Sequence, residues 1–179
     1  MTNYATPTVV PQTIPDDDMT PLERLLLTNI FDADDINGEH YFYAEESPQT
    51  LLTLDKAELD AAIAASQEHP SSALLAIQEQ LSHCEPDQSI IYLDLSGFSW
   101  ETIVQDVVRR SKTLEYISVI SSFTCSKMHS DGFGGMAVVI TGTAIRGKST
   151  EDILEELLEE EEAGPFAPVA SAAGDHANV

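Results

Sequence analysis

The sequence predicts an α+β fold in which helices pack on a mostly antiparallel sheet with a long hairpin near its C-terminal end. Helical and strand-like segments follow one another without the strict βαβ alternation of a parallel sheet. Segments 115–127 and 136–145 are apolar on both faces and flank a glycine-rich loop, which is typical of a central hairpin.

Five helices are indicated by N-terminal signals followed by apolar periodicity. The clearest starts at Thr20, where Pro21 and Glu23 complete a capping box, and runs to about Phe31. The other expected helices are 56–68 after Asp55, a helix to about Cys84 after Ser71 or Ser72, a helix through Val108 after Ser99, and one of about 12 residues after Ser149 or Thr150.

Three further strands are indicated by β-branched or aromatic content. They are expected at 40–45, 50–54 and 89–95. Between the first helix and the first of these strands, residues 32–39 predict an acidic loop with an Asn37-Gly38 turn.

Composition divides the chain into three parts. Residues 1–18 contain three prolines and an aspartate run, so a disordered N-terminal arm is expected. Residues 19–162 are expected to form a single α+β domain, and residues 163–179, rich in alanine, glycine and proline, a disordered tail. There is no Sec-type signal pattern and no apolar stretch of about 20 residues, so a cytoplasmic protein without a membrane partner is expected.

The net charge of −23 is distributed unevenly. Residues 101–150 hold 6 basic and 4 acidic residues, whereas residues 151–179 hold 9 acidic residues and no basic ones. Because duplex DNA and anionic lipids attract cations, direct binding to either is disfavoured. The charge instead favours a basic protein surface as the partner.

The densest acidic block, Glu151–Glu162, carries eight carboxylates. They surround two apolar pairs, Ile153-Leu154 and Leu157-Leu158. A helix of this length spans about 18 Å, over which duplex DNA carries about 11 charges. A DNA-mimicking surface that occupies a nucleic-acid-binding protein is therefore one interpretation, and a solvated face that aids solubility is the other. The residues expected to contact a partner are Asp16, Asp17, Asp18, Asp34, Asp35, Glu155, Glu156, Glu159 and Glu160.

The segment 124–135 suggests a different function. In a regular strand Cys125, Lys127, His129 and Asp131 share one face, and a thiol with an imidazole and a carboxylate is the nucleophile arrangement of cysteine hydrolases. Strand neighbours two residues apart lie about 7 Å from each other, however, which is beyond hydrogen-bond reach. A small enzyme or ligand-binding domain and a structural turn both stay open.

Residues 124–135, Thr-Cys-Ser-Lys-Met-His-Ser-Asp-Gly-Phe-Gly-Gly, resemble a pattern of uncharacterised accessory proteins from proteobacterial plasmids and phages. The resemblance implies a mobile-element accessory protein, but it implies no activity or cofactor. Anti-defence inhibition is the most concrete version of the interaction with a nucleic-acid-binding partner that the acidic blocks suggest. The histidines and cysteines lack metal-binding spacing, and the acidic loop fails the calcium-loop pattern, so no cofactor and no metal are expected. A non-enzymatic interaction protein is the leading prediction, with an enzyme and a structural accessory subunit as alternatives.

Overall fold

The computed structural model describes residues 3–69, 71–82, 88–127, 129 and 132–162. Its main element is a seven-stranded antiparallel sheet with the order β3-β4-β2-β7-β8-β9, in which β1 also pairs with β7. The prediction of an α+β fold with a mostly antiparallel sheet is confirmed. The strands are β1 (Tyr4–Ala5), β2 (Thr8–Pro15), β3 (Asp32–Asp35), β4 (Glu39–Ala44), β7 (Tyr116–Cys125), β8 (Gly134–Thr141) and β9 (Ile145–Ser149).

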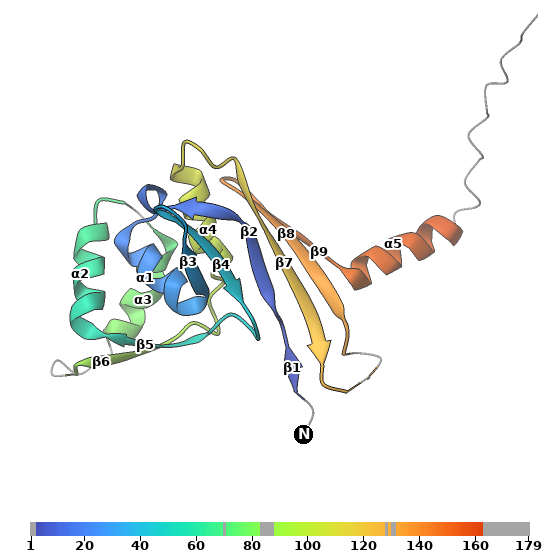
Figure 1. Cartoon of the computed structure of the whole chain (residues 1–179), viewed down its shortest axis with the longest axis horizontal. Helices are drawn as coiled ribbons and strands as arrows, with labels where there is room; N and C mark the ends of the chain where they lie inside the picture. The colour runs from blue at the N-terminus through green and yellow to red at the C-terminus, as the bar shows by residue number, and fades with distance from the viewer. Residues whose placement is uncertain (1–2, 70, 83–87, 128, 130–131, 163–179) are drawn as a thin grey trace, which may run out of the picture.

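Five helices and a two-stranded sheet complete the described fold. Figure 1 shows α1 to α4 gathered to one side of the large sheet, whereas α5 extends away from the edge formed by β9. No helix among the described residues is long and apolar enough to span a membrane. The helices are α1 (Pro21–Ile30), α2 (Lys56–Ser66), α3 (Ser72–Leu81), α4 (Glu101–Arg110) and α5 (Thr150–Glu162), and the small sheet pairs β5 (Leu51–Asp55) with β6 (Ile90–Asp94).

The core lies between the helices and one face of the large sheet, which we call the inner face. Alternate residues of β2, β4, β7 and β8 are buried there against apolar residues of α1 and α4. The buried inner-face residues include Val10, Ile14, Phe42, Ile117, Val119, Val138 and Ile140. The other face of the sheet, which we call the outer face, lacks such a cover, since its residues on β7, β8 and β9 are exposed or half-buried.

Local capping signals place most helix starts. The Thr20 hydroxyl accepts a bond from the Glu23 amide at 3.2 Å, and the Thr20 amide donates to the Glu23 carboxylate at 2.9 Å, as the capping box predicts. Asp55 and Ser71 cap α2 and α3. The predicted Ser99 cap is wrong, because α4 starts after Trp100 and no side chain caps it.

The N-terminal arm is the largest difference from expectation. Residues expected to be disordered form β1 and β2, and β2 lies between β4 and β7 inside the sheet. Proline disfavours a central strand because it cannot donate a ladder hydrogen bond. Here the register shifts between Val10 and Ile14, so Pro11 falls in an irregular stretch, and Pro15 is the last residue of the strand.

The acidic segment after α1 also differs from expectation. Asp32–Asp35 is an edge strand, β3, rather than a loop, and its charges discourage further pairing along that edge. The predicted Asn37-Gly38 turn connects it to β4, and both residues adopt positive φ, of 59° and 83°.

The predicted C-terminal hairpin is present, with different ends. The expected strand over 136–145 divides into β8 and β9 around a turn in which the Thr141 amide donates to the Ala144 carbonyl. The predicted helix after Ser149 is α5. The tail expected at 163–179 lies outside the described residues.

Candidate interaction site

Helix α5 begins with a reciprocal cap that its own sequence supplies. The Ser149 amide and hydroxyl donate to the Asp152 carboxylate at 2.6 and 2.8 Å, and the Asp152 amide donates back to the Ser149 hydroxyl. The bond from the Ser149 amide, followed by that from its hydroxyl, lowers the pKa of Asp152 below its ordinary value. Asp152 therefore serves the helix start rather than a partner.

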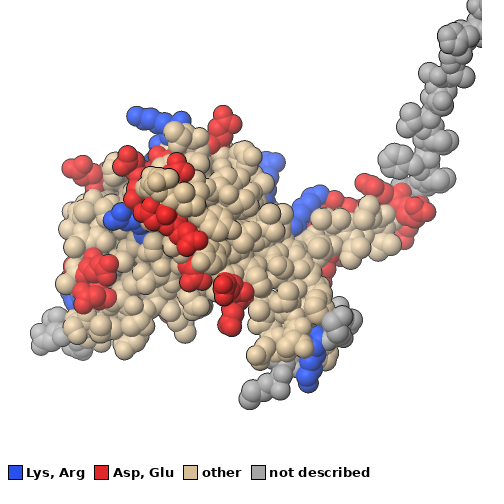
Figure 2. Space-filling model, viewed as in Figure 1, with Lys and Arg blue, Asp and Glu red and all other residues tan. Residues whose placement is uncertain are grey.

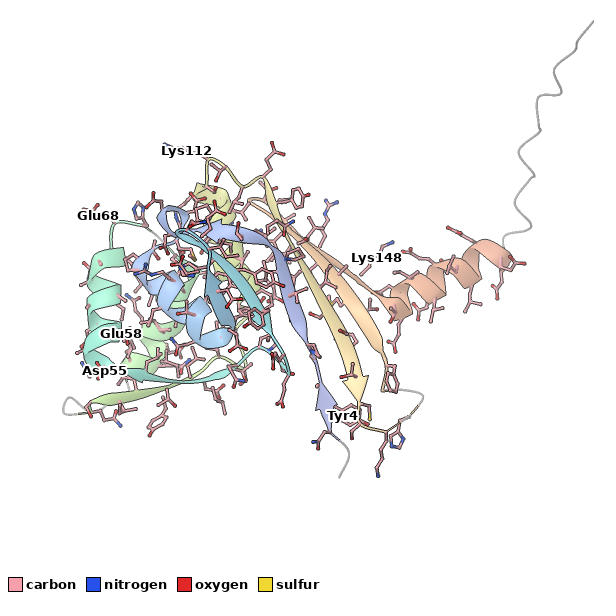
Figure 3. All side chains as sticks on the ribbon, viewed as in Figure 1. Tyr4, Asp55, Glu58, Glu68, Lys112 and Lys148 are labelled. Carbon is pink, nitrogen blue, oxygen red and sulfur yellow. The ribbon has the colours of Figure 1, made fainter. Side chains whose placement is uncertain are left out.

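No residue of α5 is buried. At its base the Gly135 amide donates to the Thr150 hydroxyl at 3.2 Å, and Lys148 on β9 binds both carboxylate oxygens of Glu156 at 2.6 Å. Figure 3 places Lys148 between β9 and the helix. These contacts hold the first turns of the helix beside the sheet edge and leave the rest in solvent.

The apolar residues of α5 form one stripe. Ile153, Leu154, Leu157 and Leu158 follow the i, i+1, i+4, i+5 spacing of one helix face, and their exposed fractions are 45%, 58%, 56% and 66%. The carboxylates cover the remaining circumference. A helix with an apolar stripe is normally stabilised by packing that stripe on another surface, but all four stripe residues of α5 stay exposed in the described part of the chain.

The structure separates the acidic clusters that the sequence grouped together. Asp34 and Asp35 lie on β3, at the opposite edge of the sheet from β9 and α5. Figure 2 shows acidic side chains over the helical side of the molecule and again around α5, with a broad uncharged surface between them. One flat partner surface therefore does not contact both clusters at once.

The aspartate cluster before α1 is engaged within the protein. Asp18 accepts hydrogen bonds from the hydroxyls of Ser111 at 2.6 Å and Thr113 at 3.2 Å. Asp17 is exposed. Asp18 thus ties the loop after α4 to the end of β2, which is a structural role rather than a partner contact.

Asp16 lies in a cavity of about 440 Å³ between α1, α2 and the β3–β4 turn. Its carboxylate binds His40 Nε2 at 2.7 Å and Arg24 at 3.3 Å. Asp16, Asp35 and His40 each offer a ligand atom within 4.8 Å of the others, a separation at which a metal ion could be held. The Arg24 guanidinium already supplies a positive charge to Asp16. We therefore interpret the cluster as an ion-pair network and not as a metal site.

An Asp16→Asn variant is expected to be less stable than the wild type at neutral pH by less than about 1 kcal/mol, because the pairs are partly exposed. Burial by itself raises the pKa of Asp16, but the hydrogen bonds from His40 and Arg24 outweigh it and lower the pKa below 3.8. A lowered pKa gives stability that is present above 3.8 and is lost as the pH falls through the folded-state value. Urea unfolding over a pH series should show the two proteins converging in acid; a difference that persists there contradicts the assignment.

The segment proposed for nucleophilic chemistry does not continue as a strand. Strand β7 ends at Cys125, and the backbone then turns, with the His129 amide donating to the Lys127 carbonyl at 2.8 Å. The Cys125 thiol is buried, and a Cβ atom at Gly132 would lie 2.5 Å from the Cys125 Cβ. Asp131 lies outside the described residues. Burial against a close-packed glycine is typical of a structural cysteine, because a nucleophilic thiol needs access to substrate.

Comparisons with protein-family models, with curated proteins and with solved structures gave no match to this chain. The assignment of function therefore depends on the site itself.

One set of surface residues was missed from the sequence. Tyr41, Tyr43, Ile120 and Val139 lie on the outer sheet face, where they are exposed or half-buried. The period-2 alternation of β4 indicated that half of its residues face away from the core, but the alternation alone did not show which strands combine into that face.

Proposed function

We propose that this chain is a non-enzymatic interaction protein that docks on a basic protein surface through α5. The proposal rests on one observation: no residue of α5 is buried, so its apolar stripe and most of its carboxylates are exposed to solvent. An amphipathic helix that lays its apolar face into a groove is a recurring mode of protein recognition. The partner's groove is apolar at its centre and rimmed by lysine or arginine.

Charge density suggests which proteins have such a rim. The 13 residues of α5 span about 20 Å, and they carry eight carboxylates where duplex DNA carries about 12 charges. A nucleic-acid-binding protein is therefore the class of partner that we propose, with inhibition of a defence complex as one case. The leucines are a difference from DNA, because a phosphate backbone offers no such apolar contact, and they would add affinity for this one partner.

Energetic grounds argue against a purely structural role for the acids on α5. Glu151, Glu155 and Glu159 follow one another at i, i+4 spacing and repel, and glutamates at the last turn face the negative end of the helix dipole. Each effect costs tenths of a kcal/mol. A sequence optimised only for helix stability would place lysine or arginine at the last turn.

The test uses the immobilised full chain to capture proteins from a bacterial lysate, followed by elution with duplex DNA. We expect the captured partner to be a nucleic-acid-binding protein that DNA displaces, with an affinity that falls steeply as salt rises. Glu155→Gln with Glu159→Gln should weaken binding by about twofold to thirtyfold, since exposed ion pairs contribute about 0.2–1 kcal/mol each. The matched control is Glu45→Gln with Glu46→Gln, which removes the same charge from another exposed site.

The apolar stripe is tested separately. Leu154→Ser with Leu157→Ser should weaken binding by more than tenfold, because buried apolar anchors at interfaces commonly contribute over 1 kcal/mol each. Leu75→Ser on α3, where the side chain is 73% exposed, is the control and should leave binding unchanged. The proposal is contradicted if DNA does not displace the captured partner. It is also contradicted if the partner binds both α5 double variants with the same affinity as the wild type.

A further inference from the structure

The outer sheet face carries an apolar centre that nothing in the described chain covers. Ile120 and Val139 are 51% and 44% exposed there, and Val9, Tyr41 and Tyr43 are half-buried beside them. Large exposed apolar side chains that are contiguous on one face mark an interaction surface more often than isolated ones do. The question is which molecule covers them.

Strand register places these residues in rows across the sheet. In one row successive Cα partners run from Asp32 on β3 through Tyr43, Val9, Ile120 and Ala137 to Lys148 on β9. Because paired residues point to the same side of a sheet, all six share the outer face. The row is acidic at one end, apolar in the middle and basic at the other.

A parallel row repeats this order two residues further along the strands. It has two parts, on either side of the irregular stretch of β2: Asp34 is paired with Tyr41 at the β3 edge, and Val139 is paired with Ser118 and Arg146 at the β9 edge. Lys148 is already paired with Glu156, whereas Arg146 forms no ion pair with any residue in the described part of the chain. Asp34 and Arg146 therefore define the charged ends of the face.

The acidic end holds aromatic side chains beside several carboxylates. Tyr41 and Tyr43 stack with ring centroids 5.6 Å apart, next to the aspartates of β3. The pKa of Tyr43 is raised above its ordinary value, first by the charge of Asp34 and then by burial and the charges of Asp32 and Glu45. An unbalanced negative charge beside an aromatic pair is suited to a cationic counterpart on whatever docks there.

We propose that a second copy of this chain covers the outer sheet face, forming a homodimer with a twofold axis parallel to the strands and midway between the two sheets. This axis places the β3 edge of each copy over the β9 edge of the other. Asp34 then meets Arg146 of the second copy, Tyr41 meets Val139, and Val9 meets Ile120. An axis perpendicular to the strands would instead place β3 over β3 and bring like charges together.

Size and shape agree with a dimer. Six strands of 4 to 10 residues, at about 4.8 Å spacing and about 3.4 Å per residue, give a face of roughly 650 Å² before side-chain relief is counted. A standard stable interface buries about 800 Å² on each partner. The two tyrosines face the smaller Ala137 and Val139, and pairing large with small residues lets facing sheets interdigitate. The dimer is independent of the partner proposed for α5, which lies beyond the sheet edge.

The test is the mass of the full chain in solution by sedimentation velocity and light scattering. We expect a dimer for the wild type, a folded monomer for Ile120→Asp and an unchanged dimer for Leu75→Asp, whose site on α3 is also exposed to solvent. Circular dichroism confirms that each variant is folded. The α5 variants Leu154→Ser and Leu157→Ser should stay dimeric, which separates this interface from the docking helix.

Charge exchange tests the orientation of the axis. Asp34→Arg and Arg146→Asp should each weaken dimerisation at least several-fold, because each homodimer then sets like charges against each other. Mixing the two variants in equal amounts should restore a dimer that contains one of each, since both contacts are again of opposite sign. A monomeric wild type, a dimer that Ile120→Asp leaves intact, or a mixture that stays monomeric overturns the proposed dimer.

Discussion

A variant with methionine in place of Arg110 is expected to lose about 3–5 kcal/mol in the free energy of unfolding. Arg110 on α4 forms an ion pair with Glu23 on α1, and the Glu23 side chain is fully buried. The Glu23 carboxylate also accepts hydrogen bonds from the Thr20 amide and the Ser71 hydroxyl, so it joins the starts of α1 and α3 to the end of α4. Methionine preserves most of the side-chain volume but leaves a buried charge without its cation. Urea unfolding at neutral pH measures the loss.

The matched control is Arg24→Met on α1. Arg24 is half exposed and pairs with Asp16 at 3.3 Å, so its loss should cost at most about 1 kcal/mol. Adding Glu23→Gln to the Arg110→Met variant removes the unpaired charge. The second substitution should therefore lower the free energy of unfolding by less than Glu23→Gln does in the wild type, as expected for coupled residues. If Arg110→Met and Arg24→Met cost the same, the Glu23 pair does not hold the helices together.

Deletion of residues 1–15 is expected to abolish cooperative folding. These residues contain β2, which pairs with β4 on one side and β7 on the other, so their loss divides the sheet and exposes the inner-face core. Removal of residues 150–179 is the contrasting truncation, and it should preserve a cooperative transition because no residue of α5 is buried. Thermal and urea unfolding followed by circular dichroism distinguish the two.

Point variants in β2 test the same assignment without a deletion. Ile14 is fully buried, and Ile14→Ala should cost about 2–5 kcal/mol. Val9 lies on the outer face of the same strand, so Val9→Ala should cost under about 1.5 kcal/mol. Equal and small effects at both positions would show that the strand is not part of the core.

The features predicted well from the sequence are those set by neighbouring residues. The capping box at Thr20 and the Asn37-Gly38 turn depend on bonds that span three residues or fewer, and the structure contains both. The C-terminal hairpin was also predictable, because its two strands are adjacent in the chain. The fold class follows from such local signals taken together.

The features that were missed depend on distant partners. Strand β2 has three prolines in or beside it, and only its pairing with β4 and β7 makes it central. All three residues of the acidic cluster Asp16–Asp18 were assigned to a partner, although His40, Arg24 and Ser111 bind two of the carboxylates. For α5 the sequence showed both the acids and the leucines, but only the structure shows that the leucines stay exposed within the described part of the chain.

The central position of β2 has a consequence for synthesis on the ribosome. Thr8 pairs with Ser121, so the second neighbour of this strand is made more than a hundred residues after it. Closing so long a loop costs entropy before any contact compensates for it, and sheets with such distant pairings fold slowly. Until β7 emerges, β2 presents an unpaired edge to other nascent chains, a state in which β proteins aggregate. Chaperone dependence should therefore fall sharply once the chain has been extended past β7.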